Sequence, residues 1–74
     1  MSYTEMKNKA AALGWEIVGI KQSYADEYVV MVKRSSMPIE RAYSTHKYSD
    51  MAKSFYYGHY DMSQAAATKS LEER

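Results

Sequence analysis

The sequence predicts a small α+β domain, built as a two-layer sandwich in which an antiparallel sheet of three to four strands is flanked by an N-terminal and a C-terminal helix. Three observations support this class. Residues 2–13 and 61–73 have helical character, residues 15–34 are rich in β-branched side chains, and residues 39–60 alternate and contain many aromatic rings. The chain has 74 residues, which is enough for a single domain over residues 1–74.

The first predicted helix spans residues 2–13. Ser2 and Glu5 match a capping box, in which two side chains satisfy backbone N–H groups at the start of a helix. Gly14 provides the stop, because glycine adopts the left-handed conformation at low cost. Apolar residues recur at helical spacing and form one stripe, which consists of Tyr3, Met6, Ala10 and Leu13.

Two strands are predicted next, WEIVGIKQS at residues 15–23 and EYVVMVKR at residues 27–34. The polar link at residues 24–26 has the length of a hairpin loop. The middle of the second strand is apolar on both faces, which predicts a central strand covered on both sides by helices or by a partner chain. One face carries Tyr28, Val30 and Val32, and the other carries Val29 and Met31.

Pro38 breaks the pattern, and the alternation after it predicts a third strand at residues 39–46. Residues 47–60 allow two interpretations. Ser49 or Asp50 could cap a short helix, or SFYYGHY could form a fourth strand after the turn YSDMAK. The aromatic richness favours the strand, because rings pack well on a pleated surface.

The closing helix is predicted at residues 61–73, with Asp61 or Ser63 as its N-cap and three alanines that favour helix. We expect both helices to cover one face of the sheet, which leaves the other face partly exposed. The apolar seam of this helix is expected to consist of Met62, Ala66 or Ala65, and Leu71.

Composition excludes several classes of protein. Ten basic and nine acidic side chains give a formal charge of +1, which is typical of neither a polybasic nucleic-acid binder nor an acidic DNA mimic. The absence of cysteine excludes disulfides and thiolate zinc sites. The start of the chain reads as neither a signal nor a transit peptide, and apolar runs are too short to span a bilayer. We therefore expect a cytoplasmic protein without a membrane partner.

The sequence contains no constellation that favours catalysis. His46 and His59 are the only histidines and lie outside any metal-binding pattern, and no serine lies in a GxSxG elbow. No glycine-rich loop is present to hold a phosphate. A domain of this size also has little room for the 300–1,000 Å³ pocket typical of small-molecule sites. We expect no enzyme activity, no metal, no cofactor and no small-molecule substrate.

Eight tyrosines and six methionines indicate a role in protein recognition, because both residue types are enriched at interfaces. The prediction is a non-enzymatic binding module whose partner is another protein or a second copy. In size and composition it resembles subunit adaptors and small phage-encoded inhibitors, anti-CRISPR proteins among them. The residues expected to contact the partner are Tyr43, Tyr48, Tyr56, Tyr57, Tyr60, Arg41 and Lys47.

The stretch FYYGHYD, residues 55–61, is expected to be half core and half interface. An edge strand of this kind also invites pairing with a copy of itself. Alternation places Phe55, Tyr57 and His59 toward the helices, and Tyr56 and Tyr60 outward.

The alternative function is nucleic-acid binding, in which tyrosines stack on bases. The order α-β-β-β-α resembles that of double-stranded RNA-binding domains, although the last helix begins SQAAATKS and not with a lysine-rich segment. The cations for this function would be Lys33, Arg34, Arg41, Lys47 and Lys53.

Overall fold

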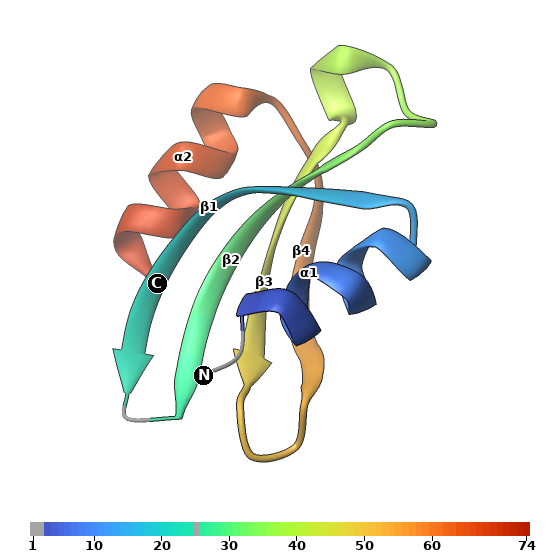
Figure 1. The fold of residues 1–74 in the computed structure, drawn as a ribbon. Helices are drawn as coiled ribbons and strands as arrows, with labels where there is room; N and C mark the ends of the chain where they lie inside the picture. Colours follow the sequence, from blue (N-terminus) through green and yellow to red (C-terminus); the bar gives the residue numbers. More distant parts are fainter. Residues whose placement is uncertain (1–2, 25) are drawn as a thin grey trace.

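The computed structural model of the protein describes residues 3–24 and 26–74. The four strands form one antiparallel sheet in the order β1-β2-β3-β4 (Figure 1). The predicted α+β class, with a helix before and a helix after an antiparallel sheet, is confirmed. The elements are α1 (Tyr3–Ala12), β1 (Trp15–Tyr24), β2 (Glu27–Arg34), the 3-10 turn η1 (Ile39–Arg41), β3 (Tyr43–Ser49), β4 (Ser54–Met62) and α2 (Gln64–Glu73).

Most predicted bounds agree with the structure, and β4 confirms the strand interpretation of SFYYGHY. The third strand was predicted at residues 39–46 and instead spans β3, because residues 39–41 form η1. The Arg41 N–H donates to the Pro38 carbonyl at 2.9 Å, which closes a turn where an extended chain was expected. Ser2 of the predicted capping box lies outside the described residues.

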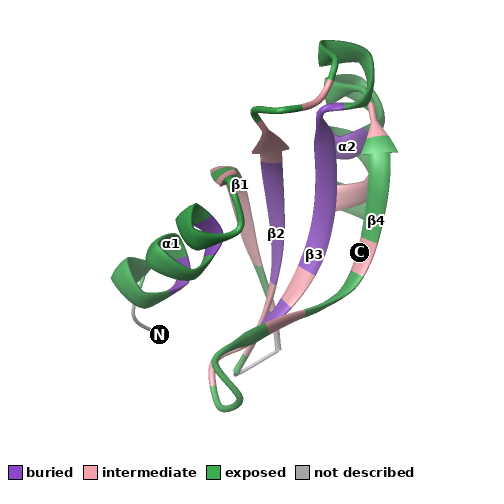
Figure 2. Cartoon of the chain, turned by 90° about the vertical axis from the view of Figure 1, so that its right-hand side faces the viewer, coloured by how far each residue is buried: buried purple, intermediate pink, exposed green. Residues whose placement is uncertain are grey.

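The two helices cover opposite faces of the sheet, whereas both were expected on one face (Figure 2). Met6 of α1 packs with Val30, and Ala67 of α2 packs with Met31. Neighbouring residues of a strand point to opposite faces, so these contacts place the sheet between the helices. The expectation that β2 is a central strand covered on both sides is confirmed.

Each helix buries a narrower stripe than expected. Met6 is fully buried, but Tyr3 and Leu13 are exposed because α1 is short and contacts the sheet mainly over β1. In α2, Ser63 is the N-cap, and its Oγ accepts the Ala66 N–H at 3.2 Å. With the helix starting at this cap, Ala67 is the alanine that faces the sheet and is buried. Ala65 and Ala66, which were expected in the apolar seam, are exposed.

Both edges of the sheet are irregular. The pairing of β4 with β3 shifts register twice, and Tyr57 and Asp61 in β4 have φ values of 51° and 58°. The pairing of β1 with β2 shifts between Ile17 and Gly19. Bulges interrupt the row of backbone groups that another strand would need. Neither described helix has the length and hydrophobicity required to cross a membrane.

Candidate functional site

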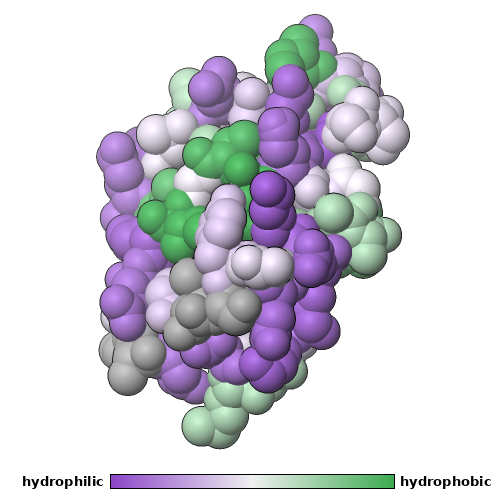
Figure 3. All heavy atoms as spheres, viewed as in Figure 1, coloured by the Kyte–Doolittle hydropathy of each residue, from purple (hydrophilic) through white to green (hydrophobic). Residues whose placement is uncertain are grey.

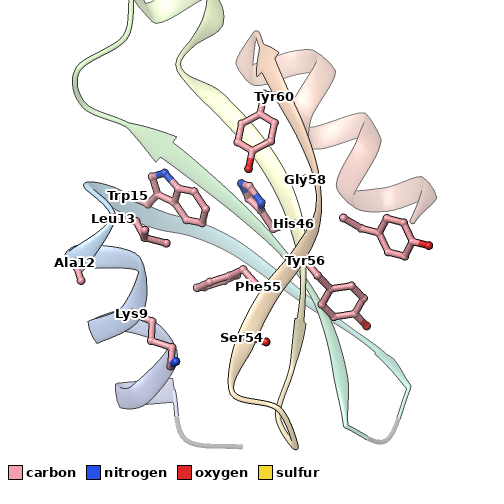
Figure 4. Close-up of a pocket in the computed structure, with 11 residues that line it drawn as sticks. Lys9, Ala12, Leu13, Trp15, His46, Ser54, Phe55, Tyr56, Gly58 and Tyr60 are labelled. Atoms are coloured by element: carbon pink, nitrogen blue, oxygen red, sulfur yellow. The ribbon is translucent and has the colours of Figure 1, made fainter.

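A groove of about 440 Å³ lies between the C-terminal end of α1 and β4, and it is open to solvent (Figure 4). Its volume falls in the range typical of ligand sites, so the expectation that the domain lacks room for such a space was wrong. The lining residues are Lys9, Ala12, Leu13, Trp15, His46, Ser54, Phe55, Tyr56, Tyr57, Gly58 and Tyr60.

Aromatic rings form the floor of the groove. Trp15 stacks on His46 with ring centroids 4.2 Å apart and planes inclined by 22°. Phe55 meets Trp15 edge-on at 5.4 Å, and Tyr60 meets His46 edge-on at 5.0 Å. Edge-to-face and offset packing of this kind stabilises ring clusters. Figure 4 shows these four rings directed into the space between α1 and β4.

Local sequence explains why Trp15 reaches this position. Gly14, with φ of 78°, ends α1 and turns the chain directly into β1. The first residue of β1 is therefore close to the C-terminal end of α1. Trp15 and Leu13 consequently lie on either side of this turn and both line the groove.

His46 is 1% exposed and carries no charge at neutral pH. Burial, followed by the positive charges of Arg74 and Arg34 and the nearby His59, lowers its pKa to about 4. The His46 Nε2 atom lies 2.9 Å from the Ser44 hydroxyl, within hydrogen-bonding distance. The floor of the groove is therefore an apolar, uncharged surface at pH 7.

The structure brings together part of the predicted contact set. Tyr56, Tyr57 and Tyr60 all border the groove and are 36%, 71% and 51% exposed. Of these, only the Tyr60 ring is directed into it, because the Tyr56 ring lies on the other side of β4 (Figure 4) and the Tyr57 ring lies beside Lys47 on the α2 face. Tyr43 and Tyr48 are buried in the two halves of the core, so neither side chain is accessible to a partner.

Arg41 and Lys47 of the predicted contact set do not line the groove. Arg41 is exposed in η1. Lys47 lies on the sheet face that carries α2, where its Nζ is 3.3 Å from Glu27 and 5.7 Å from the centre of the Tyr57 ring.

The bulges in β4 overturn the expected alternation of FYYGHYD. Phe55 points toward α1 as predicted, but Tyr57 and His59 are exposed. Tyr60, which was expected to face outward, packs on His46 on the α1 side. The left-handed conformation at Tyr57 breaks the two-residue period of the strand, so simple alternation fails after that residue.

Sequence reasoning missed the other half of the groove, namely Lys9, Leu13, Trp15 and Phe55 as surface-forming residues. One signal was available, because the single tryptophan directly follows the glycine that ends the first helix. Such a ring lies at a junction between two elements and is rarely enclosed completely.

The predicted basic set is largely neutralised. Arg34 pairs with Asp61 at 2.8 Å, Lys47 with Glu27 at 3.3 Å, and Lys53 with Glu5 at 2.6 Å. Burial, together with a hydrogen bond to Glu27, also raises the pKa of Tyr56 to about 12. Within residues 3–24 and 26–74, no group of three or more histidine or carboxylate side chains is arranged to hold a metal ion.

The remaining surface offers no broad apolar area on the side seen in Figure 3. Strongly hydrophobic residues there form small separate green areas among purple and pale ones. The aromatic groove combines a volume in the range of ligand sites with exposed rings, and we take it as the candidate functional site.

Gly58 is required by the close packing at the groove floor. A Cβ atom at this position would lie 2.8 Å from His46 Nδ1 and 2.7 Å from Tyr60 Cε2. We expect Gly58→Ala to lower the free energy of unfolding by about 1–3 kcal/mol, as overpacked sites do. Urea denaturation followed by Trp15 fluorescence measures this loss.

The background variant Tyr60→Ala provides the control for this prediction. Tyr60→Ala removes the exposed ring but leaves His46 in place. Gly58→Ala should therefore lower the free energy of unfolding by less in the Tyr60→Ala background than in the wild type. Equal losses in both backgrounds would show that Tyr60 does not contribute to the close contact.

Comparison of the chain with protein-family models, with curated proteins and with solved structures finds no match.

Proposed function

We propose that the protein is a non-enzymatic binding module that docks another protein in the groove between α1 and β4. The observation that carries this proposal is a groove of about 440 Å³ with an aromatic floor and with Leu13 and Tyr60 exposed by 57% and 51%. Desolvated aromatic contacts dominate the energetics of protein interfaces. A module of this kind acts as an adaptor or as an inhibitor by occupying a surface of a larger protein.

The proposed partner is recognised by its side chains and not by strand pairing. The edge of β4 is bulged at Tyr57 and Asp61. The carbonyl of Tyr57 also accepts a hydrogen bond from the Arg74 guanidinium, so it is already occupied. An added strand would need a continuous ladder that this edge does not present.

The charges favour a protein over a nucleic acid. Nucleic-acid binding draws its affinity from lysine and arginine contacts to phosphates. In this structure Arg34, Lys47 and Lys53 are paired with carboxylates, which reduces the charge that they offer. Fluorescence polarisation with short single- and double-stranded DNA and RNA at about 50 and 200 mM salt tests the alternative. Salt-sensitive binding would replace the proposal with nucleic-acid recognition.

Selection from a displayed library of random dodecapeptides tests the proposal directly. Peptides that bind should perturb the backbone amide resonances of Leu13, Trp15, Gly58 and Tyr60 in a ¹H–¹⁵N correlation spectrum. The variant Leu13→Asp should weaken binding about tenfold or more, which is the effect of losing an interface anchor.

Ile39→Asp is the matched control, because Ile39 is 58% exposed, close to the 57% of Leu13, and does not line the groove. This variant should bind the selected peptides as the wild type does. Perturbations that map away from the groove, or equal losses in both variants, would contradict the proposal.

A further inference from the structure

We infer that the occupant of the groove is an acidic peptide segment, whose apolar side chain lies on the Trp15 and Phe55 rings while a neighbouring carboxylate pairs with Lys9. This inference rests on the proposed function and specifies the chemistry of the partner. It follows from the distribution of charge and apolar surface around the groove.

The lining carries one kind of charge. Lys9 is exposed in the last turn of α1, and no carboxylate is among the residues that line the groove. Among the described residues, no aspartate or glutamate forms an ion pair with Lys9 within 4.0 Å, whereas Lys53 is held by Glu5. Lys9 is therefore available to an anionic group on a partner.

The other polar groups beside the groove are neutral or paired. His46 lies on the floor and carries no charge at pH 7. Arg34 lies above the Tyr60 ring, with its guanidinium carbon 5.3 Å from the ring centre. Arg34 is, however, paired with Asp61 at 2.8 Å, so Lys9 is the charge that the lining residues offer, and an occupant of opposite charge complements it.

The apolar part of the occupant follows from the rings. Trp15, Phe55 and Tyr60 present ring surface to the groove, and Leu13 adds an exposed aliphatic side chain at its rim. An aromatic or large aliphatic side chain from the partner would cover these groups. The complementary segment therefore combines one such anchor with a nearby aspartate or glutamate.

The dodecapeptide selection supplies the first readout. Peptides selected on the wild type should contain an acidic residue within three positions of an aromatic or large aliphatic residue, at least threefold more often than the starting library does. The variant Lys9→Glu should bind a selected acidic peptide about fivefold more weakly, the upper range for an exposed ion pair. The control Lys7→Glu makes the same charge change at an exposed position of α1 outside the groove and should bind as the wild type does.

A double-mutant cycle tests whether Lys9 contacts the acidic residue of the peptide. The selected peptide is compared with an analogue in which the acidic residue is replaced by its amide. The wild type should lose about fivefold in affinity for the analogue, and Lys9→Glu should lose none. Titrations monitored by ¹H–¹⁵N correlation spectra confirm that each variant is folded and that the peptide occupies the groove.

The outcomes separate the two levels of the proposal. Peptides that occupy the groove without acidic enrichment, or equal effects of Lys9→Glu and Lys7→Glu, would overturn the acidic-segment inference and leave protein docking intact. Peptides that bind elsewhere, or oligonucleotides that perturb the same groove resonances, would overturn both.

Discussion

Acidification from pH 7 to pH 4 is expected to lower the free energy of unfolding by about 2–3 kcal/mol through His46 alone. His46 has a pKa of about 4 in the folded protein, against an ordinary value of 6.5. Between these two values the unfolded chain binds a proton that the folded protein does not bind. The stability contributed by His46 is therefore complete above about pH 6.5 and is lost as the pH falls toward 4.

Urea denaturation at pH 7, 6, 5 and 4 measures this dependence for the wild type and for His46→Gln. The variant should show a smaller slope over this range, whatever its absolute stability. His59→Gln is the comparison, since His59 is exposed and is the smallest of the four influences that lower the pKa of His46, so most of the wild-type slope should remain. A slope that His46→Gln leaves unchanged would show that other groups cause the acid sensitivity.

The second large effect is expected at Tyr48, which is fully buried among Met6, Val30 and Val32. Its hydroxyl has no hydrogen-bond partner among the described residues, and burial raises its pKa. Tyr48→Phe removes a buried unsatisfied group and should stabilise the protein by about 1 kcal/mol. Tyr48→Ala removes the ring as well and should lower the free energy of unfolding by about 3–5 kcal/mol.

Thermal unfolding followed by circular dichroism distinguishes the two variants. For a domain of this size, 1 kcal/mol shifts the midpoint by about 4–8 °C, so Tyr48→Phe should melt above the wild type by that amount. A lower melting temperature for Tyr48→Phe would mean that the hydroxyl makes a stabilising contact, and it would contradict the assignment of Tyr48 as an unsatisfied core residue.

Local chemistry made most of the fold predictable. The glycine stop at Gly14 and the apolar run of β2 determine elements through short-range rules, and these elements lie where the sequence placed them. The turn after Pro38 was missed because a 3-10 turn and a strand start are both compatible with proline followed by mixed residues. The side on which each helix packs was also missed, because the apolar stripe of a helix shows which of its own faces is buried and not which face of the sheet it meets.

The site was predictable only in part. Aromatic composition drew attention to five tyrosines, but it could not separate the exposed Tyr56, Tyr57 and Tyr60 from Tyr43 and Tyr48 in the core, and alternation wrongly placed Tyr57 toward the helices. That separation depends on which face each strand residue points to. In β4 the faces are reassigned by the backbone bulge at Tyr57, and a tyrosine with positive φ has no sequence signature.

The strand order β1-β2-β3-β4 also has a consequence for how the chain folds. Each strand pairs with the strand before it, so most contacts join segments that are close in sequence, and such topologies fold faster than those with distant pairings. The exception is α2, whose Leu71 contacts Gly19 across most of the chain. We expect the α1 and hairpin segments to form the folding nucleus and α2 to dock afterwards, so substitutions at Ala67 or Leu71 should speed unfolding more than they slow folding.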